Sequence, residues 1–191
     1  MSDLTPTELA LQAAADIAAT TGVPHHDIAL TLGSGWKSAP HHLGETVAEV
    51  HAERIAGFRA SPVLGHTGTL RSIRTPDGIR VLVVGARTHL YEGHGVAATV
   101  HGVRAAAATG ASIMILTNGA GAVDANRVPG DATLIEDHIN LTAQSPLVGA
   151  RFIDLTDLYS QRLRKHREGG GAGAHRSRLR TAARPPLRDP G

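Results

Sequence analysis

Three short apolar segments, each followed by a polar segment that contains glycine, constrain the fold of this chain most. The apolar segments are 27–32, 81–84 and 112–116, and the polar segments that follow them are 33–36, 85–95 and 117–121. Strands that are apolar on both faces and alternate with helices are typical of an α/β domain with a largely parallel, covered sheet. Ligands bind beyond the carboxyl ends of the strands in such sheets. The three polar segments are therefore predicted to converge and to form the functional site.

The N-terminal segment has a clear helix start. Thr5 and Glu8 have the spacing of a capping box, Pro6 occupies the first helical position, and Gly22 is placed to end the helix. The other elements expected from the pattern are a helix at 96–109 closed by Gly110, a short strand at 133–135, and a helix at 154–165 capped by Asp154 or Thr156.

Composition excludes several classes of protein. The chain has 191 residues, 41% of them hydrophobic, which is enough for one domain with a core. It has no cysteine, so disulfides, thiolate zinc sites and a cysteine nucleophile are excluded. No apolar run approaches the roughly 20 residues of a membrane helix, and the sequence begins without the features of a signal peptide. We therefore expect a cytoplasmic protein that does not bind membranes.

The basic charge of the chain is concentrated at its C-terminal end. Residues 168–191 hold five of the 19 basic residues and two of the 17 acidic ones, which leaves 14 basic and 15 acidic residues elsewhere. A nucleic-acid-binding tail is one alternative, but the tail has no aromatic side chain to stack on bases and the remainder is nearly neutral. We expect no nucleic-acid partner. The tail lacks periodic apolar residues, and we expect it to be disordered.

Each polar segment admits a chemical and a plain structural interpretation. Gly33-Ser34-Gly35 is suited to hold a phosphate with backbone N–H groups and a hydroxyl, or is a simple turn. Arg87, His89 and Tyr91 alternate, so an extended chain would present them on one face, with Glu92 at the turn; the alternative is a surface loop with an Arg–Glu pair. Asn118 follows a strand and offers a donor and an acceptor, or belongs to an ordinary loop.

Metal binding is not expected. The pairs His25-His26 and His41-His42 lack the spacing of a helical zinc site. His66 is either a ligand-binding residue or a solvent-exposed histidine of a loop. Asp124 and Asp131 are expected to be cap or turn residues.

The ordered set of motifs resembles one family. The motifs are G-S-G-W, G-H-T-G, G-A-R-T-H-L-Y-E-G, L-T-N-G-A-G, G-D-A-T-L-I-E-D-H-I-N-L-T, S-P-L-V-G and R-F-I-D-L-T-D-L-Y-S. Together they resemble the trimeric type of purine nucleoside phosphorylase over residues 5–167, and 138–165 is most similar to the enzymes of high-GC Gram-positive bacteria. The resemblance implies a three-layer phosphorylase/hydrolase-like α/β fold with a mixed, largely parallel sheet.

The resemblance also implies roles for single residues. The phosphate-binding set is Ser34, His66, Arg87, His89, Asn118 and Gly119, where family members often have Ala in place of Gly119. Catalytic roles fall to His89 and Glu92, and Glu92 bonds within the phosphate and histidine network. Tyr91 and Phe152 match ribose-binding residues, and Phe152 reaches a neighbouring subunit, which implies a homotrimer. Ala120 and Gly121 match residues that line the purine.

The implied reaction is reversible phosphorolysis of purine (2′-deoxy)ribonucleosides to the free base and (deoxy)ribose 1-phosphate, a step of purine salvage. Inorganic phosphate is then a co-substrate, and no cofactor is expected. Two alternatives remain open: a methylthioadenosine phosphorylase of the same family, and a catalytically impaired, truncated subunit.

The chain departs from the family after Arg167. The family has a G-P-x-Y-E-T-P segment, a Met-Ser segment and a purine-binding Asn that this sequence lacks. With one choice of codons, residues 184–191 read one base later give Gly-Pro-Pro-Tyr-Glu-Thr-Pro, which predicts a frameshift; a divergent natural tail is the alternative. We expect residues 1–167 to form an incomplete phosphorylase-like domain, followed by a non-homologous tail (168–191). Low stability and weak or absent phosphorolysis are the predicted consequences.

Overall fold

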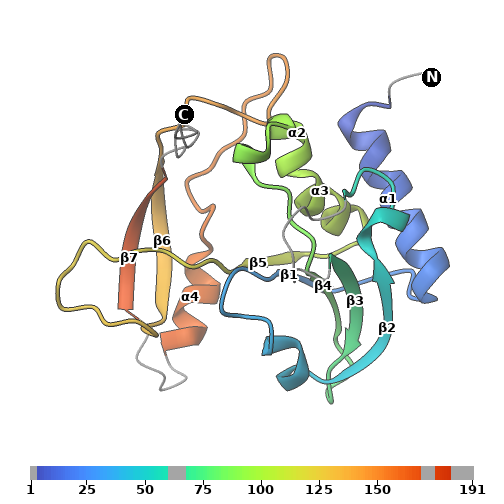
Figure 1. Ribbon diagram of the computed structural model, residues 1–191, viewed down its shortest axis with the longest axis horizontal. Coiled ribbons are helices and arrows are strands. Elements are labelled where there is room, and N and C mark those ends of the chain that lie inside the picture. Colours follow the sequence, from blue (N-terminus) through green and yellow to red (C-terminus); the bar gives the residue numbers. More distant parts are fainter. Residues whose placement is uncertain (1–3, 60–67, 169–174, 182–191) are drawn as a thin grey trace, which may run out of the picture. The chain divides into compact units, whose positions relative to one another are not determined.

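The computed structural model describes residues 4–59, 68–168 and 175–181, with side chains described through residue 165. It divides into two compact units, residues 1–120 and 121–191 (Figure 1). All buried side chains among the described residues belong to the first unit. The domain over 1–167 that the sequence indicates stays a prediction.

The first helix forms as predicted. Helix α1 spans Pro6–Thr21, and the Thr5 hydroxyl accepts a hydrogen bond from the Glu8 N–H while the Glu8 carboxylate accepts one from the Thr5 N–H. Gly22 ends the helix in the left-handed conformation, at a φ of 70°. Ala13 and Ile17 of α1 are fully buried in the core.

The sheet of the first unit is mixed, and its strand order is β2-β3-β4-β1-β5. The strands are β1 (Ile28–Thr31), β2 (Glu45–His51), β3 (Thr69–Arg74), β4 (Arg80–Val84) and β5 (Ile113–Leu116). β1 pairs in parallel with β4 and β5, whereas β3 is antiparallel to both β2 and β4. The expected α/β fold with a mixed sheet is confirmed, and its parallel part is β4-β1-β5.

Helices pack on the face of the sheet that contains Leu82 and Val84. The segment predicted as one helix at 96–109 forms two, α2 (Gly95–Thr99) and α3 (His101–Ala108), and α3 lies beside α1 in Figure 1. Ala105 and Ala106 of α3 share a core cluster with α1 and with the inward side chains of the sheet. A second cluster, Leu30, Ile73, Val81 and Val83, occupies the opposite face. Short 3-10 turns lie at Ala39–His42, Ala52–Arg54 and Leu90–Glu92.

The second unit contains a two-stranded parallel sheet and one helix. Strand β6 (Thr133–Asn140) is longer than the predicted strand at 133–135, and it pairs with β7 (His175–Thr181). β7 lies in the segment that was expected to have no regular structure, and its backbone pairs with one edge of β6. The rest of the tail lies outside the described residues.

Helix α4 (Gln161–Glu168) begins later than the predicted helix at 154–165. The Asp154 carboxylate accepts hydrogen bonds from the Thr156 N–H and hydroxyl, which favours a turn over a helix start. Asp157 instead accepts a bond from the Gln161 N–H at 2.9 Å. Within the part of the chain that the structure describes, no helix is both long and apolar enough to cross a membrane.

Candidate functional site

The three polar segments leave the sheet at one edge, as the sequence predicted. Thr31, the last residue of β1, lies opposite Val84 of β4 on one side and Leu116 of β5 on the other. Because the three strands are parallel, their carboxyl ends are adjacent. Segments 32–36, 85–95 and 117–120 therefore start next to one another.

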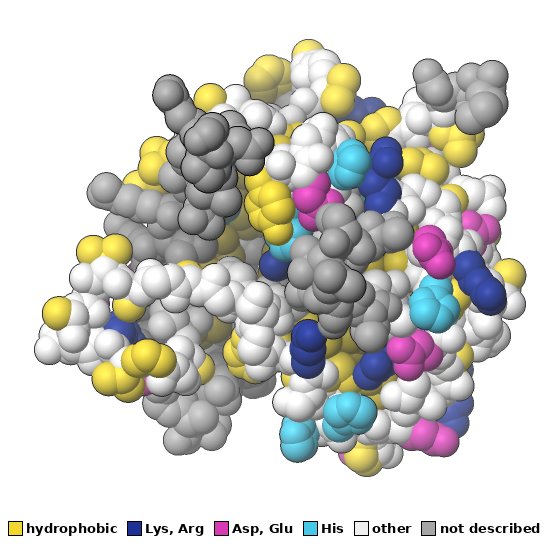
Figure 2. All heavy atoms as spheres, in the orientation of Figure 1, with side chains coloured by type: hydrophobic (Ala, Val, Ile, Leu, Met, Phe, Trp, Pro, Cys, Tyr) yellow, Lys and Arg dark blue, Asp and Glu magenta, His cyan; other side chains and the backbone are white. Residues whose placement is uncertain are grey.

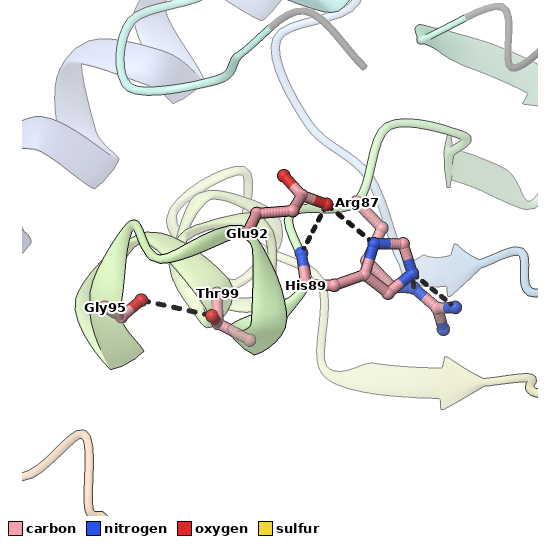
Figure 3. A network of polar contacts seen from close by, with 5 residues as sticks. All are labelled: Arg87, His89, Glu92, Gly95 and Thr99. Carbon is pink, nitrogen blue, oxygen red and sulfur yellow. Dashed lines mark hydrogen bonds and ion pairs between the residues drawn. The ribbon is translucent and has the colours of Figure 1, made fainter. Parts of the chain in front are cut away.

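Arg87, His89 and Glu92 form a hydrogen-bonded network (Figure 3). Arg87 approaches Nε2 of His89 through Nε at 3.3 Å and Nη2 at 3.1 Å. On the other side of the ring, Nδ1 lies 2.8 Å from Oε1 of Glu92. Arginine only donates, so Nε2 accepts, and the proton resides on Nδ1 and is donated to the carboxylate. Glu92 thus fixes the orientation and the tautomer of the ring.

The local backbone positions Glu92. The 3-10 turn Leu90–Glu92 brings its carboxylate back to the His89 N–H, which donates to Oε1 at 2.9 Å. The Glu92 side chain is only 8% exposed. Burial alone would raise the pKa of this carboxyl, but hydrogen bonds from the His89 backbone and ring lower it below its ordinary value. The carboxylate is therefore ionised at neutral pH.

Tyr91 joins the network through its ring. The rings of His89 and Tyr91 are stacked, with centroids 4.9 Å apart and an interplanar angle of 18°. The predicted association of Arg87, His89 and Tyr91 is confirmed: His89 is extended, and the 3-10 turn that follows it places the Tyr91 ring against the imidazole. The alternative of a direct Arg87–Glu92 pair is wrong, because the imidazole lies between the two side chains.

The loops after β1 and β5 are in contact. The N–H of Gly33 donates to Oγ1 of Thr117 at 2.8 Å. A Cβ atom on Gly119 would lie 3.7 Å from Cβ of Ser34, so these two predicted phosphate-binding residues are neighbours. Ser34, Asn118 and Gly119 are exposed and accessible to a ligand. Thr117 is a contact residue that the sequence pattern did not single out, because its only signal is a hydroxyl directly after an apolar strand.

The structure leaves the remaining predicted site residues untested. His66 lies outside the described residues. Ala120 is exposed at the end of the first unit, whereas Gly121 and Phe152 belong to the second unit, which the structure describes separately. Phe152 is 95% exposed. Its role in a ribose pocket stays a prediction.

The two histidines at 25 and 26 have other partners. His25 lies 3.4 Å from a carboxylate oxygen of Asp27, and buried His26 is hydrogen-bonded to Ser72 at 2.8 Å. In residues 4–59, 68–168 and 175–181, no group of three or more His, Asp or Glu side chains is placed to hold a metal ion. Asp124 and Asp131 accept hydrogen bonds from nearby backbone N–H groups, which confirms them as turn residues.

The fold is that of an α/β protein, and its candidate anion-binding site lies at the carboxyl ends of the three parallel strands β4, β1 and β5. The sequence profile of the Phosphorylase superfamily matches residues 27–182, and the chain belongs to that family. The match extends past residue 167, where the sequence resemblance was expected to end. It therefore includes β7.

Two relatives illustrate the similarity. The chain is 57% identical over 162 residues to a purine nucleoside phosphorylase of Cellulomonas sp, with 82% of this chain and 57% of the relative covered. It is 50% identical over 161 residues to the purine nucleoside phosphorylase of Mycobacterium tuberculosis, with 84% and 59% covered. The chain thus spans less than two thirds of the length of these relatives. The predicted similarity to actinobacterial enzymes is confirmed.

Solved structures show the same fold. The purine nucleoside phosphorylase of Schistosoma mansoni in complex with BCX-34 superposes with a TM-score of 0.81 at 26% identity, covering 96% of this chain and 72% of that chain. Isoform 2 from the same organism, in complex with cytosine and ribose-1-phosphate, gives a TM-score of 0.79 at 25% identity, covering 95% and 70%.

Proposed function

We propose that this chain acts as a purine nucleoside phosphorylase, which converts a purine (2′-deoxy)ribonucleoside and inorganic phosphate into the free base and (deoxy)ribose 1-phosphate. The observation that supports this most is that Arg87, with its histidine and glutamate partners, lies on the segment that leaves the sheet beside the two loops that contain Ser34 and Gly119. A guanidinium, a hydroxyl and loop N–H groups are the donors that a phosphate requires.

The proposed chemistry relies on positioning. The bond from the purine nitrogen to C1′ breaks with its electron pair leaving on the base, and a phosphate oxygen forms the new bond to C1′. The sugar is oxocarbenium-like in between, and the phosphate dianion stabilises its positive charge. Arg87 and the two loops hold the phosphate, and Glu92 holds the His89 ring. No covalent bond to the protein is needed.

The remaining roles are proposed on the family resemblance. His66 completes the phosphate site, Tyr91 and Phe152 contact the ribose, and Ala120 and Gly121 line the purine. Inorganic phosphate is the co-substrate and no cofactor takes part. We further propose that the chain assembles as a homotrimer and acts in the cytoplasm. Methylthioadenosine stays an alternative substrate.

Phosphate-dependent cleavage of inosine and adenosine by the purified 191-residue chain tests the proposal. We expect slow cleavage that requires phosphate and that falls at least tenfold in Arg87→Ala. Arg74→Ala, an exposed arginine at the end of β3, is the matched control and should keep the wild-type rate. Cleavage that continues without phosphate, or that Arg87→Ala leaves unchanged, would contradict the proposal.

A second candidate is a subunit that binds phosphate without turnover. It is favoured by the sequence, because the residues matched to the phosphate include Arg87 and His89, whereas those matched to the purine, Ala120 and Gly121, offer only backbone groups. Phosphate binding by calorimetry together with no cleavage of either nucleoside would select this candidate.

A further inference from the structure

One hydroxyl joins the two loops of the proposed phosphate site. Thr117 follows the last residue of β5, and its Oγ1 accepts a hydrogen bond from the Gly33 N–H at 2.8 Å. The same hydroxyl donates to the carbonyl oxygen of Thr31, the last residue of β1, at 3.1 Å. The Thr117 side chain therefore connects the end of β1, the loop that contains Ser34, and the loop that contains Gly119.

The two backbones are too close at this point for any other side chain at residue 33. A Cβ on Gly33 would lie 2.4 Å from the carbonyl oxygen of Thr117 and 2.7 Å from Cα of Asn118. Gly33 is buried and Thr117 is half-buried, so the Gly33 N–H depends on the Thr117 hydroxyl for its hydrogen bond. Contact and hydrogen bond together fix the spacing of the loops.

The hydroxyl is not needed to pair the strands. The Thr117 N–H already donates to the Thr31 carbonyl at 3.0 Å, and β1 and β5 pair residue for residue from Ile28 opposite Ile113 to Thr31 opposite Leu116. Removing the hydroxyl therefore leaves the sheet in place and releases the loop after β1. What changes is the distance between the Ser34 hydroxyl and the donors at 118 and 119.

We propose that Thr117 is a positioning residue of the anion site, which sets the separation of the Ser34 and Gly119 loops without touching the anion. The inference rests on the proposed function in taking that anion to be inorganic phosphate. Donors on two separate loops bind an anion well only when their spacing is fixed beforehand. Loss of one such hydrogen bond corresponds to about a 3- to 10-fold change in affinity.

The test compares three variants of the full chain. Thr117→Val keeps the shape and removes the hydroxyl, and Thr117→Ser keeps the hydroxyl. Thr109→Val is the matched control, because the Thr109 hydroxyl is buried and donates to Ala106 at 2.8 Å within the helix end that precedes β5. Calorimetry with inorganic phosphate gives the affinity, circular dichroism gives the unfolding midpoint, and amide exchange reports the Gly33 N–H.

We expect Thr117→Val to weaken phosphate binding about 3- to 10-fold and to speed exchange at Gly33, with Thr117→Ser within twofold of the wild type. Thr109→Val should lower the midpoint and leave phosphate affinity unchanged. Where cleavage is measurable, the KM for phosphate should rise in Thr117→Val while the KM for inosine does not.

The outcomes separate this inference from the proposed function. Unchanged phosphate affinity in Thr117→Val, or an equal loss in Thr109→Val, would overturn the positioning role. A folded wild-type chain that does not bind phosphate would overturn it as well, and so would a Thr117→Ser variant that fails to bind. Phosphate binding without nucleoside cleavage would instead contradict only the proposed function.

Discussion

The two units of this chain differ in how their side chains are buried. In the first unit, Leu70, Leu82 and Val84 are buried between the sheet and the helices, and the candidate site lies at the edge of that sheet. Among residues 121–165, none is buried. Hydrophobic side chains lie on the surface of this unit, as Figure 2 shows, and Val148 and Phe152 are among them. Local stability in the first unit comes from packing, and in the second from backbone pairing and turns.

Replacing one leucine by alanine in each unit tests this difference in burial, and it has the largest expected effect on stability. Leu82→Ala removes a fully buried side chain from β4 and should lower the free energy of unfolding by about 2–5 kcal/mol. Leu155→Ala, at a side chain 56% exposed in the second unit, should change it by no more than about 0.5 kcal/mol. Urea denaturation of both variants measures the effect. Equal losses would mean that the second unit has a core of its own.

The buried histidine of the first unit should make its stability depend on pH. Burial lowers the pKa of His26 from 6.5 to about 4; the charges of His25 and Arg80 act in the same direction, and Asp27 acts against them. Because the unfolded chain binds this proton more readily, the stabilisation is complete above about pH 6.5 and is lost as the pH falls towards 4. The loss should be about 3 kcal/mol at most.

Unfolding free energies measured from pH 4 to pH 7 test this expectation. The variant His26→Leu has no ionisable ring at this position, so its profile should be flatter than that of the wild type over this range. Parallel profiles would assign the acid sensitivity to other groups.

The contact between the loops should respond to a single added methyl group. Gly33→Ala places a Cβ against the Thr117 carbonyl and should cost about 1–3 kcal/mol. Gly119→Ala adds a methyl group to the other loop. Its Cβ would lie 3.7 Å from Cβ of Ser34, an ordinary van der Waals contact, so the stability should hardly change. Thermal denaturation distinguishes them, and a tolerated Gly33→Ala would show that the loops separate easily.

The smallest expected effect on stability concerns Phe152. Its exposed ring contributes little to the folded chain, so Phe152→Ala should change the free energy of unfolding by less than about 0.5 kcal/mol. Under the proposed trimer, the same variant should weaken self-association, which sedimentation analysis measures. A destabilised variant with unchanged association would place the ring inside its own unit.

The sequence predicted the three parallel strands because each is apolar throughout. β1 and β4 are covered as expected, whereas β5 was expected to be buried and leaves Ile115 and Leu116 exposed at the end of the sheet. The sequence did not predict β2 and β3, since Arg71 and Ser72 interrupt the apolar pattern of β3. The buried position of Ser72 is explained only by its distant partner, His26. The late start of α4 was missed because Asp154 forms a turn with Thr156, a local choice that the residue pattern leaves open.

The candidate site also has a part that the sequence predicted and a part that it did not. The association of Arg87 and His89 with Glu92 was predictable because these residues lie within one short segment, and local geometry brings them together. The hydrogen bond from Gly33 to Thr117 could not be predicted, since it depends on the register of β1 against β5.

That difference in sequence separation has a consequence for how the site assembles. The His89–Glu92 bond spans 3 positions along the chain, whereas the Gly33–Thr117 bond spans 84. By the logarithmic dependence of loop-closure entropy on length, the longer loop costs about 3 kcal/mol more to close. The histidine network can thus form early in folding, but the loops meet only after β1 and β5 have paired. During refolding, affinity for phosphate should therefore appear later than the secondary structure around Arg87.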